Sequence, residues 1–120
     1  MKLNPNCIRD ILLTVEEHSD FHHQTEYHKE NPFERLSNYP HEEIIYHIKQ
    51  CEESDLISNV HYYDGGNNID ILDLTPQGHE FLANIRNDSV WKKVVSKCAG
   101  ASLPIMLTAA KDIAIKYFLG

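Results

Sequence analysis

The hydrophobic period of the chain changes near residue 56, and this change constrains the fold more than any other feature. Before it, Ile44, Ile48 and Cys51 recur at the spacing of one helix face. After it, two short runs rich in β-branched and aromatic residues, 56–63 and 69–74, flank the segment Asp64-Gly65-Gly66-Asn67-Asn68. Glycine and asparagine at such a position are typical of a hairpin turn. The sequence therefore predicts a helix over 41–54 followed by a β-hairpin.

Further helices are predicted on both sides of the hairpin. A capping residue followed by proline opens two of them, as Asn4-Pro5 and Thr75-Pro76. Apolar repeats extend the first over residues 4–17 and predict two more over 89–98 and 102–119. The residues expected in the core are Ile8, Ile11, Leu12, Val15, Ile44, Ile48, Leu56, Leu74, Phe81 and Leu82.

Residues 18–40 lack a regular period and are interpreted as a surface loop, with a short helical turn at 33–36. Four histidines fall within eleven residues of this loop, but their spacing matches no zinc pattern, so no metal site is expected. A solvated polar loop is favoured, with a pH-dependent contact surface as the alternative. The loop aromatics could either anchor it to the core or bind a partner. The residues concerned are His18, His22, His23, His28, Tyr27, Phe33 and Tyr39.

The order helix, loop, helix, hairpin, helix is that of a winged-helix domain, an α+β fold. In such domains the helix before the hairpin is the one that enters the major groove of DNA, and the hairpin is the wing. We therefore predict a winged-helix-like domain over residues 1–87 and a C-terminal helical extension over residues 88–120.

Three segments also carry a resemblance to a known family. They are Glu43-Ile44-Ile45-Tyr46-His47-Ile48-Lys49-Gln50, Leu56-Ile57 and Leu74-Thr75-Pro76-Gln77-Gly78-His79-Glu80-Phe81-Leu82. Together they resemble the family of domain of unknown function 2513, found in bacteria and their phages, over residues 4–87. The resemblance implies a winged-helix fold and supplies no activity and no catalytic residues. The chain departs from the common pattern at Ser54-Asp55, where a glycine would ease a left-handed helix end; aspartate tolerates that conformation.

The charge of the chain argues against strong binding to DNA. The chain has 11 Lys and Arg and 18 Asp and Glu, which gives a formal net charge of −7. Binding to DNA requires basic groups that contact the phosphates. The candidate interaction surface consists of outward residues of the 41–54 helix and of the hairpin. They are Tyr46, His47, Lys49, Gln50, Tyr62 and Tyr63.

No catalytic motif is present, so we expect no enzyme activity, no catalytic residue and no cofactor. Cys7, Cys51 and Cys98 lie on apolar stripes with no metal-knuckle or redox spacing, as expected for buried free thiols. The serines lie outside any Gly-x-Ser-x-Gly elbow. Met1-Lys2 leads into Asn4-Pro5 and not into an apolar run, which favours a cytoplasmic location. The family resemblance implies that this is the cytoplasm of a bacterial host.

Residues 102–119 are the most apolar stretch, with three charges, which makes a membrane span unfavourable. We expect this helix to pair with a second copy of the chain or to fold back on the domain, and we favour a homodimer. An interfacial membrane helix is the less favoured alternative. The candidate oligomerisation residues are Ile105, Ala109, Ile113 and Phe118.

The function expected from these features is binding. The leading hypothesis is a non-catalytic regulatory or protein-interaction module, which could inhibit a host protein; the identity of the protein partner is open. The family resemblance alone implies that the module is of phage or prophage type. The alternative is a sequence-specific DNA-binding transcriptional regulator.

Overall fold

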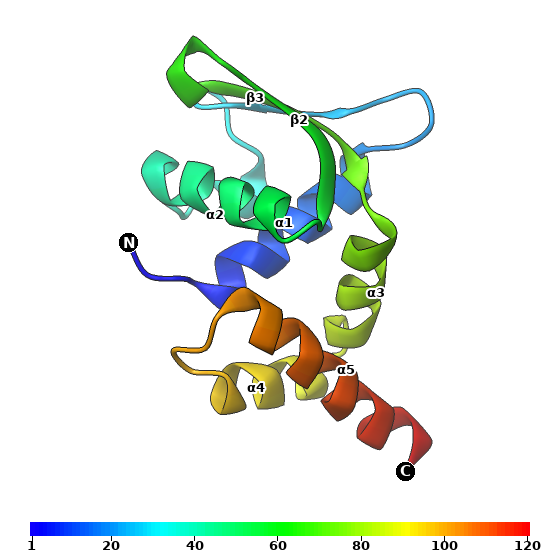
Figure 1. Ribbon diagram of the computed structural model, residues 1–120. Helices are drawn as coiled ribbons and strands as arrows, with labels where there is room; N and C mark the ends of the chain where they lie inside the picture. The colour runs from blue at the N-terminus through cyan, green and yellow to red at the C-terminus, as the bar shows by residue number, and fades with distance from the viewer.

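A computed structural model describes all 120 residues. In Figure 1 the sheet lies at the top, helices pack beneath and beside it, and the C-terminal helices lie at the bottom. In chain order the elements are α1 (Pro5–His18), β1 (Thr25–His28), the 3-10 turn η1 (Glu34–Leu36), α2 (His41–Glu53), β2 (Ile57–Tyr63), the 3-10 turn η2 (Asp64–Gly66), β3 (Asn68–Leu74), α3 (Pro76–Ile85), α4 (Asp88–Lys97) and α5 (Leu103–Leu119). The fold is thus α+β, with five helices and one antiparallel sheet.

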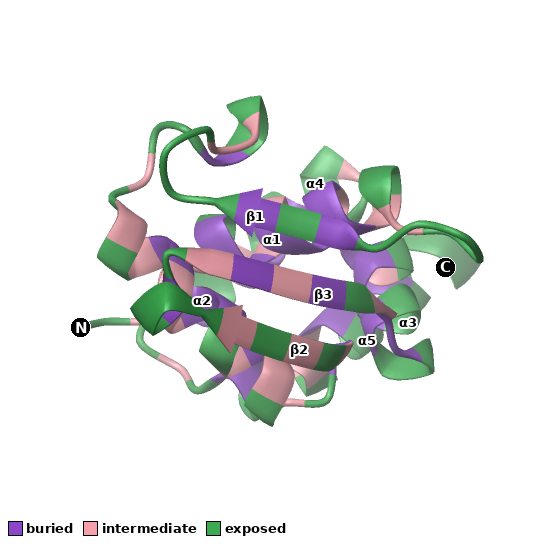
Figure 2. Cartoon of the chain, turned by 90° about the horizontal axis from the view of Figure 1, so that it is seen from above, coloured by how far each residue is buried: buried purple, intermediate pink, exposed green.

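The sheet has the order β1-β3-β2, so the last strand in the sequence lies in the middle. The predicted hairpin is confirmed: β2 pairs with β3 from Ile57–Leu74 to Tyr63–Asn68. Buried and more exposed residues alternate along the strands (Figure 2), because successive side chains point to opposite faces. The buried face covers α1 and α2.

The structure corrects the interpretation of residues 18–40 as a loop without strands. Residues 25–28 form β1, which pairs with β3, and Tyr27 is buried in the core. The aromatic residues of this segment anchor it: the Tyr27 hydroxyl lies 2.7 Å from His41 Nδ1, and Tyr39 donates a 2.6 Å hydrogen bond to Asp10. Phe33 packs against the His18 ring. The short helical turn predicted at 33–36 is present as η1.

The predicted helix starts are confirmed. The Asn4 side chain accepts hydrogen bonds from backbone N–H groups of the first turn of α1, and Thr75 does the same for α3 through Gly78. Asp55 adopts the left-handed conformation expected after α2, with φ 58°. This turn brings the Leu56 carbonyl against α3, where a Cβ on Gly78 would lie 2.0 Å from the oxygen. Gly78 is therefore required by close approach of two backbones.

One hydrophobic core extends through the whole chain. All ten residues predicted for the core are buried. Residues of α4 and α5 belong to the same buried cluster as those of α1, α2 and the sheet. The prediction of separate units over 1–87 and 88–120 stays a prediction. The three cysteines are buried free thiols, as expected.

α5 folds back onto α3 and α4 with one side only. Leu103, Met106, Ala110 and Ala114 make this buried side. Of the predicted oligomerisation residues, Ala109 and Ile113 are half-buried, while Ile105 and Phe118 are exposed. The homodimer itself stays a prediction. No helix in the structure combines the length and the apolar character that a membrane span requires.

Candidate functional site

The six residues of the candidate interaction surface do not all reach the surface of α2 and β2. Lys49 and Tyr63 are exposed, and Tyr46, Gln50 and Tyr62 are half-buried. His47 was expected to face outward, and this was wrong: its exposed fraction is 0%. Its place on α2, three residues after Ile44, puts it on the buried side of the helix. We call the remaining five residues the α2–β2 face.

His47 belongs to a buried junction between α1 and α2. Its Nδ1 lies 2.7 Å from the Glu43 carbonyl, and its Nε2 accepts the backbone N–H of Asn4 at 2.7 Å. The Asn4 side chain donates to the Glu43 carboxylate at 2.8 Å. Because both ring nitrogens are engaged, the ring carries its proton on Nδ1 and is fully satisfied. This histidine serves the fold and not a partner.

Cys7 adds a third donor type to this junction. The Cys7 thiol, the Glu43 carboxylate and the His47 ring lie within 4.8 Å of one another. A metal there would have to displace the Asn4 N–H from the His47 lone pair. Burial, together with the nearby Glu43 and Asp10 charges, raises the pKa of the Cys7 thiol to about 12, and burial also raises the pKa of Cys51. Neither thiol is available as a thiolate nucleophile at neutral pH.

On the α2–β2 face, the exposed Lys49 and the half-buried Glu52 and Tyr62 form a small cluster. The Tyr62 hydroxyl donates to the Glu52 carboxylate at 2.9 Å, and the Lys49 ammonium lies 3.5 Å from the same oxygen. The ammonium also lies over the Tyr62 ring, 5.4 Å from its centre. Burial and the bond to Glu52 raise the pKa of Tyr62. The positive charge of Lys49 is thus already opposed by a neighbour.

Lys49 is the only Lys or Arg between Arg35 and Arg86, a stretch that contains all of α2, β2 and β3. The same stretch contains nine acidic residues, which are Glu42, Glu43, Glu52, Glu53, Asp55, Asp64, Asp70, Asp73 and Glu80. The face therefore combines tyrosines with an excess of negative charge. A surface of this kind repels phosphate and favours groups that are cationic or aromatic.

Three of the four histidines of residues 18–28 contact separate partners through their rings. His18 Nδ1 lies 2.9 Å from the Thr14 carbonyl, His23 contacts Asp20, and His28 Nδ1 lies 2.8 Å from the Asn68 side chain. The His23 contact holds the pKa of Asp20 below its usual range, together with backbone N–H bonds to the same carboxylate. The structure does not bring these imidazoles together around one point.

Two members of these clusters were missed from the sequence. Glu52 was not among the candidate interaction residues, although its carboxylate lies beside the Lys49 ammonium and accepts the Tyr62 hydroxyl. Its spacing three residues after Lys49 on a helix was the available signal. Asn4 was identified as a cap, but its long-range bonds to α2 leave no sequence signal, since they depend on the packing of two helices.

The fold and this face define a small α+β protein with an acidic, tyrosine-bearing helix–hairpin surface. The family model described as "Hypothetical protein (DUF2513)" matches residues 2–104. A Haemophilus influenzae Rd protein described as "Uncharacterized protein" is 33% identical over 116 residues, which cover 95% of this chain and 92% of the relative. The chain belongs to the DUF2513 family, as its motifs indicated. No solved structure matches it.

Proposed function

We propose that this protein is a non-catalytic regulatory or protein-interaction module of phage or prophage type, built on a winged-helix-like arrangement. The element order α1, β1, α2, β2, β3 and α3 supports the winged-helix part, as does the antiparallel sheet. In this arrangement α2 takes the place of the recognition helix and the β2–β3 hairpin that of the wing.

The observation that carries the proposal is the charge of the α2–β2 face. Its single lysine is opposed by Glu52, while the surrounding helix and hairpin are acidic. Binding to DNA draws its affinity from cations at the phosphates. Tyr63 on the hairpin is exposed and Tyr46 on α2 is half-buried, and tyrosines are enriched in protein interfaces. The partner that fits is a protein with a basic surface.

An inhibitor of a host protein is one form of this proposal. An acidic helix and wing can occupy a basic groove that otherwise holds nucleic acid, because both present negative charge to it. The binding of the basic groove to this protein and its binding to nucleic acid would then both weaken as salt rises.

Site-specific photo-cross-linking tests the proposal. A photoreactive analogue replaces Tyr63, and a control analogue replaces Ala83, which is exposed on α3. We expect a cross-link to a host protein from position 63 and not from position 83, with loss of the product when Tyr46→Ala is added. The captured protein, once purified, should bind the wild type with an affinity that falls as salt rises. Capture from both positions alike would contradict a role for this face.

Sequence-specific DNA binding is the second candidate, favoured by the half-buried Gln50 and Tyr46 on the helix in the recognition position. A fluorescence titration against random and genomic duplexes decides between the two. We expect weak or absent binding near physiological salt. Nanomolar binding with a steep dependence on salt would establish the DNA-binding alternative in place of our proposal.

A further inference from the structure

The charges of the chain are divided unequally along it. Residues 88–120 contain five lysines and two aspartates, a formal charge of +3, whereas residues 1–87 contain six basic and 16 acidic side chains, a formal charge of −10. Figure 1 places α4 and α5 at the end of the molecule opposite the hairpin. An acidic protein therefore presents one basic end, which we call the α4–α5 face.

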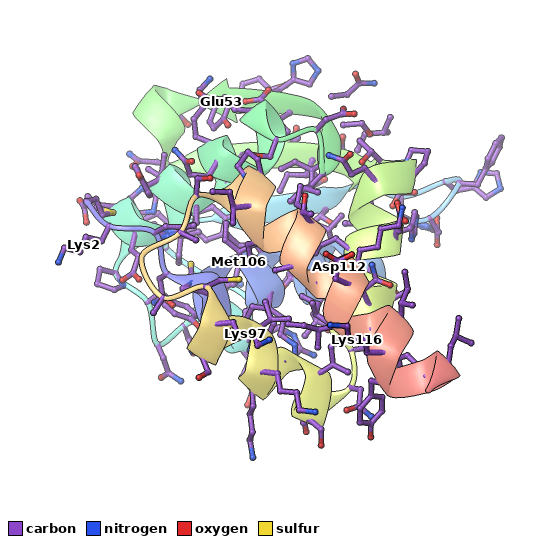
Figure 3. All side chains as sticks on the ribbon, turned by 60° about the horizontal axis from the view of Figure 1, so that its bottom comes forward. Lys2, Glu53, Lys97, Met106, Asp112 and Lys116 are labelled. Atoms are coloured by element: carbon purple, nitrogen blue, oxygen red, sulfur yellow. The ribbon has the colours of Figure 1, made fainter.

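The lysines of this face are all exposed: Lys92, Lys93, Lys97, Lys111 and Lys116. Figure 3, in which the bottom of Figure 1 comes forward, labels Lys97 on α4 and Lys116 on α5, with Lys2 at the left edge and Glu53 of α2 at the top. One aspartate, Asp88, is paired with Arg9 at 3.1 Å. The other, Asp112, is flanked by Lys111 and by Lys116 one turn later. The net charge of this end is therefore positive.

Large apolar side chains of α5 are exposed among these lysines. Their exposed fractions are 59% for Ile105, 47% for Ile115, 45% for Tyr117, 58% for Phe118 and 83% for Leu119. Four of the five belong to the last five residues of α5, which project away from the body of the protein (Figure 1). Lys93 reaches over the Tyr117 ring, 5.9 Å from its centre, so basic and aromatic groups share the same surface.

We propose that the α4–α5 face binds the surface of an anionic phospholipid membrane, with the end of α5 entering the headgroup region. Surface-bound helices combine apolar and aromatic side chains with lysines that contact lipid phosphates. Lysine and tyrosine suit this depth, since each has an apolar body and a polar end. The inference goes beyond the proposed protein interaction, which uses the opposite part of the molecule.

A second copy of the chain fits this face less well than lipid does. A symmetric contact would bring this basic face against the same basic face of the other copy. Even if each of the five side chains is counted at the roughly 150–250 Å² of an aromatic residue, half-exposed side chains offer on the order of 500 Å² together, below the roughly 800 Å² per partner in a standard interface. A lipid surface supplies the missing negative charge and accommodates a projecting helix end.

The acidic part of the protein does not prevent this binding. Seven of its 16 acidic side chains lie on the sheet strands and α2, away from α4 and α5, in a molecule whose longest extent is 46 Å; the others lie on α1, α3 and the connecting segments. The Debye length at physiological salt is about 8 Å, so charges beyond that distance from the membrane are largely screened. Repulsion of the acidic end would instead orient the protein with α4 and α5 toward the lipid.

Vesicle co-sedimentation of the full chain tests the proposal. We expect binding to vesicles of mixed phosphatidylglycerol and phosphatidylcholine, little binding to pure phosphatidylcholine, and weakening as salt rises. Lys97→Glu and Lys116→Glu should each lower the partition coefficient on the order of ten-fold. Phe118→Ser should weaken binding as well. The matched controls are Phe21→Ser, at a side chain 95% exposed on the loop before β1, and Lys29→Glu after β1, and both should bind as the wild type does.

Circular dichroism and thermal unfolding establish that each variant is folded before it is scored. Equal binding to both vesicle types, or equal loss in Phe21→Ser and Phe118→Ser, would overturn the proposal. So would a wild type that ignores vesicles and has twice the chain mass by light scattering, because the face would then be a homodimer interface. Tyr63→Ala should retain lipid binding, which separates this result from the protein-interaction proposal.

Discussion

The backbone N–H of Asn4 donates a 2.7 Å hydrogen bond to Nε2 of His47, 43 residues further along the chain. The same residue caps α1 with its side chain and binds Glu43 on α2. One buried imidazole therefore connects the start of α1 to the middle of α2. His47 therefore lies in the core, although its polar side chain had led us to predict it on the interaction surface.

His47→Ala should lower the free energy of unfolding by about 2–4 kcal/mol, because it removes a buried ring and leaves the Asn4 N–H without its acceptor. Urea unfolding followed by tryptophan fluorescence measures the change. Tyr46→Ala, one residue earlier and half-buried, is the control and should lose clearly less. Equal losses in the two variants would show that the junction contributes nothing beyond side-chain size.

Gly78→Ala should destabilise the protein by more than about 2 kcal/mol, although alanine is the better helix former by about 1 kcal/mol. The added Cβ would lie 2.0 Å from the Leu56 carbonyl oxygen, and a backbone atom cannot move aside as a side-chain end can. Thermal unfolding reports the difference. Glu80→Ala, exposed on the same helix, should change stability by about 0.5 kcal/mol or less. A stabilised Gly78→Ala would mean that α3 and the turn before β2 are further apart than described.

Ile48→Ala should cost about 2–5 kcal/mol, since Ile48 is 1% exposed in the core between α2 and its neighbours. Ile115→Ala makes the same chemical change on the outer side of α5, where half the side chain is exposed, and should cost about 1 kcal/mol or less. Chemical denaturation of both variants provides the comparison. Similar costs would indicate that Ile115 is buried by a partner under the assay conditions.

The Glu16–Arg86 pair should make stability depend on pH. Arg86 donates bonds of 3.0 and 2.6 Å to the two carboxylate oxygens, and these bonds hold the pKa of Glu16 below its ordinary value of 4.5. A lowered carboxyl pKa stabilises the folded state above the ordinary value, and this contribution is lost as pH falls through the lowered one.

Arg86→Gln should therefore cost less than about 1 kcal/mol at pH 7, because both side chains are partly exposed. The difference from wild type should shrink toward zero as the pH falls below 4.5. Unfolding measured as a function of pH tests this. Lys29→Gln, far from any carboxylate partner among the observed ion pairs, should show no such trend.

Sequence reasoning identified the elements whose apolar pattern repeats over many residues or whose ends carry a clear capping signal. Asn4-Pro5 and Thr75-Pro76 mark helix starts through local bonds, so they could be recognised without tertiary information. β1 has four residues, and two of them, Glu26 and His28, lie on the exposed face, so its alternation is too short to distinguish from a loop. Its pairing with β3 depends on residues 40 to 46 positions away.

The burial of His47 could have been predicted from its position in the sequence. It lies three residues after Ile44 and four before Cys51, which places it on the apolar stripe of α2. The polar side chain was judged by its type instead of its position. On α5 the limit was different: an apolar helix gives no indication of which side meets the core, because apolar residues occur on all sides.

The central position of β3 has a consequence for how the chain folds during synthesis. Both neighbours of β3 precede it in the sequence, so β1 and β2 have no partner in the sheet until residue 74 has left the ribosome. The hairpin closes a short loop, whereas β1 must close one of about 40 residues, which is slower. We therefore expect the β2–β3 hairpin to form first, with the other edge of β3 unpaired. β1, although it is synthesised earlier, then pairs with that edge.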